Sequence, residues 1–216
     1  MNYQKIRWHG EPLMHIKEKG KVVYLTYPVF EKLPEFVHGF STRLGGASQG
    51  IYSSMNLSFA RGDDPEAVME NYKRLADAAD IQVENMVASA QTHTINVRTV
   101  TAEDRGNGIL FPGKYPDVDG MVTDVPGVVL MTYYADCVPL YFVDPVRHAV
   151  GLSHSGWRGT VGKIGKATVE KMTQEFGSDP RDILAAVGPS ICQDCYEVSE
   201  DVILQFQSAF GQKYWK

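Results

Sequence analysis

The sequence predicts an α+β or mixed α/β domain built around mixed sheets. Apolar segments of strand length recur along the chain, and several are joined by short turns. Other strand-length segments are separated by segments with helical periodicity. Short turns favour antiparallel pairing and helical crossovers favour parallel pairing, so both are expected together. With 216 residues, of which 44% are hydrophobic, residues 1–216 are long enough for a single domain with one packed core.

Seven segments have the length, the β-branched content and the turn boundaries of strands. They are residues 22–26, 86–91, 97–100, 128–134, 138–143, 149–154 and 183–187. Two further segments are rich in Gly, Pro, Ser or Asn and are expected to be long loops, residues 41–64 and 102–120. Long loops inside a compact domain often carry function.

Three segments have the periodicity and the end signals of helices. The first begins after Asp64, an N-cap residue, with Pro65 in the first turn, and its apolar positions continue to Ala79. The second is expected over residues 160–176 and is stopped by Gly177. The third is expected over residues 199–209, with apolar side chains on one side.

The charge and the cysteine content exclude some classes of protein. A net charge of −5 argues against a nucleic-acid partner, which requires a basic surface. Residues 1–20 contain no apolar run long enough for a secretion signal or a membrane span. Three cysteines cannot all pair within one chain. We therefore expect a cytoplasmic protein that acts on a small molecule, with neither a membrane nor a nucleic acid as partner.

Two apolar runs around an Asp-Pro-Val-Arg turn predict a β-hairpin over residues 136–154. If those four turn residues form the loop, Val143 pairs with His148 and Cys137 pairs with His154. Directly opposed residues on one face have Cβ atoms about 4.5–5.5 Å apart. That separation suits a thiolate and an imidazole that share a metal, or a Cys–His catalytic pair. A slip of one residue would turn them to opposite faces.

His93, at the end of an expected strand, is the third candidate ligand beside Cys137 and His154. Two histidines and one cysteine with an open fourth position are typical of catalytic zinc. The thiolate favours zinc or a softer transition metal over magnesium or calcium. Spacing alone gives equal weight to the alternative, in which a buried cysteine and hydrogen-bonded histidines hold no metal.

Other polar side chains lie where a ligand could bind. Arg158 follows a glycine turn between a strand and a helix, which suits a phosphate or a carboxylate. Arg43 and Asn56 lie in the first Gly-rich loop and could close over a polar or anionic ligand, although a plain surface loop is the alternative. Cys192 and Cys195 form a C-x-x-C motif that cannot complete a structural zinc site alone. A redox pair is one interpretation of it, but we expect core or loop cysteines.

Eight short motifs occur in order along the chain. They are HGFSTRLGG (residues 38–46), MNL (55–57), QTH (91–93), DGMVT (119–123), ADCVP (135–139), HSGWRG (154–159), GPSIC (188–192) and CYEV (195–198). As a set they resemble the YlmD/YfiH family, once called the multicopper polyphenol oxidoreductase or laccase-domain family. The resemblance covers the chain from about residue 20 to its end.

The resemblance implies a four-layer α/β/β/α sandwich with mixed sheets, shared in outline with the catalytic domain of cytotoxic necrotizing factor. It also implies zinc held by His93, Cys137 and His154. The implied activity is phosphorolysis of adenosine, inosine, guanosine and methylthioadenosine, with adenosine deamination as a second activity. Purine nucleosides and phosphate are then the partners. Family members usually continue past the last helix expected here, so we expect residues 1–216 to be a single catalytic domain that lacks a C-terminal segment.

On this hypothesis Cys137, His154 and His93 hold zinc, and Asp136 supports the metal site or acts as an acid or base. Arg158, Arg43 and Asn56 would contact phosphate, ribose or base. A first alternative is a metal-free hydrolase with Cys137 as nucleophile and His154 as base. A second is a copper-dependent phenol oxidase, but six histidines, only two of them in the constellation, make several copper centres hard to build. A non-enzymatic scaffold is the last alternative.

Overall fold

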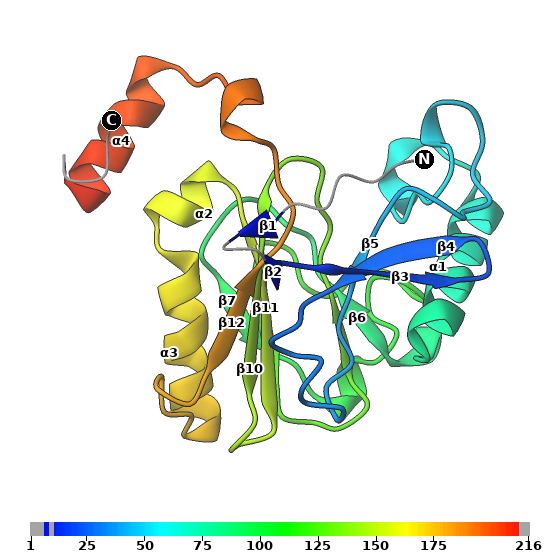
Figure 1. Ribbon diagram of the computed structural model, residues 1–216, viewed down its shortest axis with the longest axis horizontal. Helices are drawn as coiled ribbons and strands as arrows, with labels where there is room; N and C mark the ends of the chain where they lie inside the picture. Colours follow the sequence, from blue (N-terminus) through cyan, green and yellow to red (C-terminus); the bar gives the residue numbers. More distant parts are fainter. Residues whose placement is uncertain (1–6, 9–10, 212–216) are drawn as a thin grey trace. The chain divides into compact units, whose positions relative to one another are not determined.

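The computed structural model describes residues 7–8 and 11–211 and comprises two compact units, one up to Val83 and one from Glu84 onward (Figure 1). The described residues contain four α-helices and both parallel and antiparallel strand pairs, which confirms the mixed α/β class. Residues 1–6, 9–10 and 212–216 lie outside the described residues. The predictions about a leader sequence and about the C-terminal end fall partly on them. Within the described ranges, no helix combines the length and the apolar character that a membrane span requires.

The first unit has an antiparallel three-stranded sheet in the order β3-β4-β5 and a separate two-stranded ladder, β1-β2. Its strands are β1 (Arg7–Trp8), β2 (Glu11–Pro12), β3 (His15–Lys19), β4 (Val22–Thr26) and β5 (Phe40–Ser41). Strand β4 has the predicted bounds. Strand β3 was not predicted, because its mostly exposed and charged residues form an edge without the apolar alternation that marks a strand.

The helix α1 (Pro65–Ala79) begins where the sequence predicts, because the Asp64 carboxylate accepts a hydrogen bond from the backbone N–H of Glu66 at 3.0 Å. Its buried face packs against β4. The preceding loop contains two short 3-10 helices, η1 (Gly50–Tyr52) and η2 (Phe59–Arg61).

The second unit is organised by a five-stranded sheet in the order β12-β10-β11-β8-β7. All pairs are antiparallel except β7 and β8. The strands are β7 (Val97–Thr99), β8 (Gly120–Thr123), β10 (Val138–Asp144), β11 (Ala149–Ser155) and β12 (Leu184–Val187). Strands β6 (Met86–Ala88) and β9 (Val129–Met131) form a separate parallel pair.

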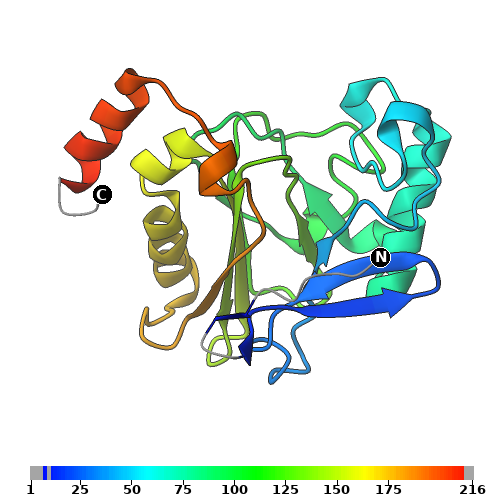
Figure 2. The ribbon, with the colours of Figure 1, turned by 45° about the horizontal axis from the view of Figure 1, so that its top comes forward.

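Strand β8 is buried on both faces, although the sequence did not predict it. Met121 packs with Val87 of β6 on one face, and Val122 packs with Met172 on the other. Met172 belongs to the helix α3 (Ile164–Phe176), which runs along that face of the sheet (Figure 2). The strand was missed because its four residues follow a long Gly- and Pro-rich loop and are all buried, so no alternation marks them.

The predicted hairpin exists, but its register differs by two residues from the predicted one. Asp144 pairs with Ala149 and Pro139 pairs with His154, so the loop comprises residues 145–148. The Asp144 side chain explains the shift, because its Oδ1 accepts the backbone N–H groups of the next turn and keeps Asp144 in the strand. His148 then closes the loop in a left-handed conformation with φ 52°.

A shift of two residues preserves the face to which each side chain points. Cys137, one residue before β10, therefore stays on the face of His154 and becomes its diagonal neighbour. Extending the observed register places Cys137 opposite Gly156. Residues with diagonal spacing lie about 7–8 Å apart at their backbones, still within reach of side chains that converge.

The predicted helix over residues 160–176 is two helices, α2 (Trp157–Val161) and α3. They are separated at Gly162 and at Lys163, which is left-handed with φ 62°. A Cβ at Gly162 would lie 2.6 Å from Cγ2 of Ile95, so a side chain there would require Ile95 to move. Gly177 ends α3 in a left-handed conformation, as predicted.

The helix α4 (Glu200–Phe210) follows Ser199, confirming the third predicted helix within one residue at each end, and contacts α2. Three short 3-10 helices complete the second unit and its start, namely η3 (Val83–Asn85), η4 (Ala102–Asp104) and η5 (Gln193–Cys195).

Candidate metal centre

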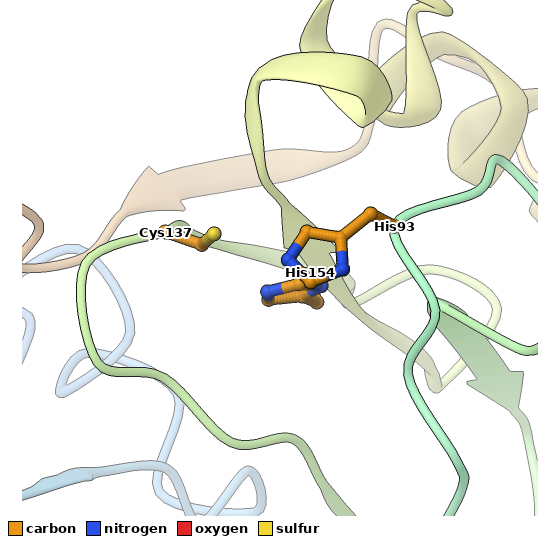
Figure 3. Close-up of side chains that lie close together, drawn as sticks. All are labelled: His93, Cys137 and His154. Atoms are coloured by element: carbon orange, nitrogen blue, oxygen red, sulfur yellow. The ribbon is translucent and has the colours of Figure 1, made fainter.

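The structure brings His93, Cys137 and His154 together at one end of the five-stranded sheet (Figure 3). One ligand atom from each, two imidazole nitrogens and the Cys137 sulfur, lies within 4.8 Å of the others. The two imidazole rings meet edge to face, with centroids 4.8 Å apart and an interplanar angle of 75°. His154 is buried, Cys137 is half-buried and His93 is exposed, so the cluster opens to one side.

Each member of the trio comes from a different part of the second unit. His154 lies in β11, and Cys137 lies just before the adjacent strand β10. His93 follows β6 and is left-handed, with φ 66°. A left-handed non-glycine residue costs roughly 1–2 kcal/mol, so surrounding contacts must hold it. Such strain is typical of functional sites.

The donor set fits a tetrahedral transition-metal ion. Two imidazoles and one thiolate are ligands of catalytic zinc and of copper, and a fourth position remains for another ligand. Gly156 leaves the space between two of them free. A Cβ at Gly156 would lie 2.8 Å from Cδ2 of His93 and 3.0 Å from Sγ of Cys137. Its φ of −71° is ordinary, so close approach rather than backbone conformation requires glycine here.

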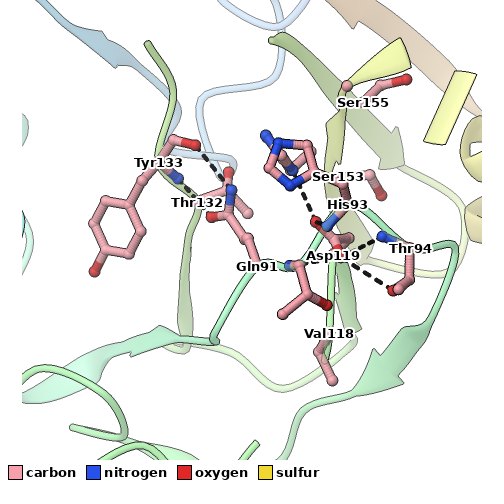
Figure 4. Close-up of polar contacts among 12 residues, drawn as sticks. Gln91, His93, Thr94, Val118, Asp119, Thr132, Tyr133, Ser153 and Ser155 are labelled. Atoms are coloured by element: carbon pink, nitrogen blue, oxygen red, sulfur yellow. Dashed lines mark hydrogen bonds and ion pairs between the residues drawn. The ribbon is translucent and has the colours of Figure 1, made fainter. Parts of the chain in front are cut away.

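Asp119 holds both histidines through a single carboxylate oxygen, and Figure 4 shows it beside His93 and Thr94. Its Oδ1 accepts a hydrogen bond from Nδ1 of His154 at 2.8 Å and from the backbone N–H of His93 at 3.0 Å. Its Oδ2 accepts the backbone N–H groups of Thr92 at 3.1 Å and Thr94 at 2.8 Å, and the Thr94 hydroxyl at 3.0 Å. Because Nδ1 of His154 donates to Asp119, Nε2 is the nitrogen left for a metal.

Asp119 is completely buried and yet remains ionised. Burial raises its pKa, but hydrogen bonds from His154 and from the backbone of Thr94, Thr92 and His93 outweigh burial and lower the pKa to about 2. A permanent negative charge therefore faces the His154 ring. A carboxylate that accepts from a metal-binding histidine fixes its tautomer and increases its basicity.

The segment that carries His93 is also tied to its neighbours. The Gln91 side chain donates to the backbone oxygen of Tyr133 at 2.8 Å and accepts the Tyr133 N–H at 2.7 Å (Figure 4). Asp117 accepts hydrogen bonds from the Thr92 hydroxyl and from the Asn96 side chain. These contacts keep the turn around His93 in place.

Cys137 is a poor thiolate without a metal. Burial raises the pKa of its thiol, and the negative charges of Asp136 and Asp119 raise it further. The binding of a metal cation would reverse this preference, because the coordinating thiol is then deprotonated.

Asp136 and Arg158, two further predicted site residues, are both exposed. The backbone oxygen of Asp136 accepts the N–H of Ile191 at 3.0 Å. The carboxylate that contacts His154 belongs to Asp119. The Arg158 guanidinium lies over the Trp157 ring, 4.2 Å from its centroid.

Arg43 and Asn56 lie in the first unit, where both brace their own loop. The Arg43 guanidinium donates twice to the backbone oxygen of Ser53, at 3.1 and 2.6 Å. The Asn56 amide donates to Asp63 at 2.9 Å and to the backbone oxygen of Ser58 at 3.2 Å.

Asp119 was missed as a site residue, although it opens the DGMVT motif. A carboxylate at the end of a Gly- and Pro-rich loop usually faces solvent, and no spacing rule connects it to a histidine 35 residues away. Its position just before a buried strand is the signal that could have found it.

The chain belongs to the multi-copper polyphenol oxidoreductase laccase family, whose profile matches residues 37–215. A crystal structure of YlmD from Geobacillus stearothermophilus superposes with a TM-score of 0.83 and 37% identity, covering 91% of this chain and 72% of that one. The resemblance to YlmD and YfiH proteins is thereby confirmed.

The curated relatives of the chain are named for two enzyme activities. A purine nucleoside phosphorylase of Deinococcus radiodurans is 44% identical over 172 residues, which is 80% of this chain and 63% of that protein. Adenosine deaminase RL5, from an unknown prokaryotic organism, is 39% identical over 182 residues, 83% of this chain and 69% of that protein. The chain spans less than two thirds of the length of three curated purine nucleoside phosphorylases that it matches.

Proposed function

We propose that this chain is the metal-binding part of a zinc-dependent purine nucleoside phosphorylase that also deaminates adenosine. The observation that supports the proposal most directly is the convergence of His93, Cys137 and His154, two of them held by one Asp119 oxygen. The names of the relatives supply the substrate class, purine nucleosides with phosphate. The nucleosides are adenosine, inosine, guanosine and methylthioadenosine.

Zinc, when bound, would supply Lewis-acid chemistry at the open side of the trio. The residues of the chain then have separate tasks. Asp119 keeps the proton on Nδ1 of His154 and thereby directs Nε2 toward the ligand position. Cys137 would hold the ion as a thiolate and would lose its proton to do so. Asp136, exposed beside Cys137, is proposed to exchange a proton with the substrate.

Substrate contacts are proposed for Arg158, Arg43 and Asn56. Arg158 offers an exposed guanidinium within the HSGWRG motif, and guanidinium groups bind phosphate with two hydrogen bonds. Arg43 and Asn56 would contact the base, the ribose or the phosphate. Their side chains already bind their own loop, so this role requires the loop bonds to be exchanged for substrate bonds.

The test is to incubate zinc-loaded protein with adenosine, with and without phosphate, and to identify the products by chromatography and mass. Adenine with ribose 1-phosphate, formed only when phosphate is present, is the expected result for phosphorolysis. Inosine in both conditions is expected for deamination. A longer version of the protein, matching the length of its relatives, is run in parallel. Absence of turnover from both would refute the proposal.

A metal-free cysteine hydrolase is the second candidate, favoured by the Asp119–His154 hydrogen bond. Cys137, His154 and Asp119 would then act as nucleophile, base and orienting carboxylate. The raised pKa of Cys137 opposes this arrangement. A strong chelator separates the two candidates, since it should abolish the zinc-dependent reaction and leave a cysteine hydrolase active.

Copper is the third candidate because the family description names it. The trio would also suit copper. A phenol oxidase requires a redox-active metal, and zinc has no redox chemistry. Oxidation of a phenol by copper-loaded protein and not by zinc-loaded protein would support this candidate.

We place the protein in the cytoplasm, where Cys137 stays reduced and able to bind a metal.

A further inference from the structure

The C-x-x-C motif lies outside the trio and has its own geometry. The Sγ atoms of Cys192 and Cys195 are 3.0 Å apart, and both residues are exposed. We expected core or loop cysteines, and the structure places both in the exposed connection between β12 and α4. Cys192 precedes the short helix η5 and Cys195 is its last residue, and the Cys195 N–H donates to the Cys192 oxygen at 3.1 Å. Residues three apart eclipse each other on a 3-10 helix, so both sulfurs point the same way.

We propose that Cys192 and Cys195 form a redox-active dithiol that reacts with low-molecular-weight disulfides and closes to an intramolecular disulfide. The sulfurs need to approach by only about 1 Å to reach the bond length of a disulfide. Both are open to a small reagent from solvent, which the half-buried Cys137 is not to the same degree.

A second metal site explains the pair less well. A metal site needs three or more His, Cys, Asp or Glu side chains close together. In the described part of the chain the group of this kind is the trio of His93, Cys137 and His154, and it does not include Cys192 or Cys195. Two thiolates alone do not complete a tetrahedral site. Two sulfurs bound to one tetrahedral zinc ion, each about 2.3 Å from the metal, would also lie farther apart than the 3.0 Å between these two.

The two cysteines differ in reactivity. The contact between the two sulfurs, and then a hydrogen bond with the Cys195 backbone, lower the pKa of Cys192, and the same sulfur contact raises the pKa of Cys195. The thiolate is the attacking species in exchange with a disulfide. The lowered pKa favours Cys192 as the attacking residue, with Cys195 as the resolving one.

The reaction with oxidised glutathione has two steps. The Cys192 thiolate attacks one glutathione sulfur, forms a mixed disulfide and releases one glutathione thiolate. Cys195 then loses its proton to solvent and attacks the Cys192 sulfur, which forms the Cys192–Cys195 bond and releases the second glutathione. The two cysteines lose two electrons in total, and these reduce the glutathione disulfide to two thiols.

The dithiol lies close in space to the residue that precedes Cys137, although the two are far apart in the chain. Ile191, the residue before Cys192, donates its N–H to the backbone oxygen of Asp136 at 3.0 Å. Metal content must therefore be followed together with oxidation, so that reaction of Cys137 is not mistaken for reaction of the dithiol.

The test is to equilibrate zinc-loaded protein with oxidised glutathione, quench with acid and count free thiols after denaturation. The native chain has three cysteines, and we expect its thiol count to fall to one without retained glutathione. Peptide mass mapping should place the lost pair at Cys192 and Cys195. Reduced glutathione in excess should restore all three thiols, and zinc content should not change.

Three variants make the test specific. Cys195→Ser should retain one glutathione at Cys192, and Cys192→Ser should react at Cys195 more slowly. Cys137→Ser is the matched control and should still close the disulfide. Three retained thiols in the native chain, or a disulfide that includes Cys137, would overturn the proposal. Because the assay reads thiols and mass, its outcome is independent of any nucleoside turnover.

Discussion

The Nδ1 atom of His154 lies 2.8 Å from Oδ1 of Asp119, and the same oxygen accepts the backbone N–H of His93 at 3.0 Å. One buried carboxylate thus sets the tautomer of one candidate ligand and the backbone position of another. The carboxylate is held ionised by its hydrogen bonds, which lower its pKa to about 2 against the effect of burial.

Asp119→Asn should weaken zinc binding by roughly 10–100-fold, as the loss of a carboxylate behind a metal-binding histidine usually does. An asparagine amide has only one oxygen that accepts hydrogen bonds, so it cannot accept from His154, His93 and Thr94 together. Affinity is measured by competition with a chromophoric chelator. Asp124→Asn is the matched control, an exposed aspartate just after β8, and should bind zinc as the native chain does. Equal affinity of both variants would contradict the role of Asp119.

Gly156→Ala should lower the zinc content without unfolding the protein. The new methyl group would lie 2.8 Å from His93 and 3.0 Å from Cys137, while the backbone at Gly156 accepts alanine without strain. Metal content by elemental analysis and the thermal midpoint of the zinc-free protein separate the two effects. Gly113→Ala is the control, because a Cβ there makes only an ordinary contact at 3.7 Å. A fully loaded Gly156→Ala protein would show that the space is not needed.

Asn71→Ala should destabilise the first unit by about 1–3 kcal/mol, the usual cost of leaving a buried polar group unpaired. The fully buried Asn71 side chain accepts the N–H of Ala47 at 2.6 Å and donates to Ser48 and to the backbone oxygen of Asn56, both at 2.8 Å. It connects α1 to the loop that carries Arg43 and Asn56. Urea unfolding measures the loss. Lys73→Ala, exposed on the same helix, should change the free energy of unfolding by less than about 0.5 kcal/mol.

Glu31→Gln should change how stability depends on pH. A hydrogen bond from Thr26 lowers the Glu31 pKa, burial raises it, and hydrogen bonds from Lys17 and His15 lower it further, to about 2 from 4.5. A lowered pKa stabilises the fold above pH 4.5, and this contribution is lost as the pH falls toward 2. The native chain should therefore exceed Glu31→Gln in stability at neutral pH, with the difference shrinking over that range.

The measurement is urea unfolding of both proteins between pH 7 and the acid limit of the fold. Glu35→Gln, at an exposed neighbouring carboxylate, serves as the control. A difference between the native chain and Glu31→Gln that stays constant down to pH about 2 would refute the assignment.

Local signals in the sequence identified much of the fold. The helix α1 follows from Asp64, Pro65 and its apolar spacing, and the hairpin of β10 and β11 follows from two apolar runs around one turn. These signals act within a few residues, so they can be read without knowing the rest of the chain. They failed at β3 and β8, where exposure or complete burial removes the alternation.

The sequence by itself determined which side chains are candidates for the centre, since His93, Cys137 and His154 were named from residue type and spacing. Only the tertiary structure decided the details. The side chain of Asp144 shifted the hairpin register by two residues, and burial beside β11 brought Asp119 to His154. The Asp144 contacts reach only two and three residues ahead and compete with the turn that the sequence predicts. The contact between Asp119 and His154 joins residues 35 apart, where the free energy of burial and hydrogen bonding outweighs local preference.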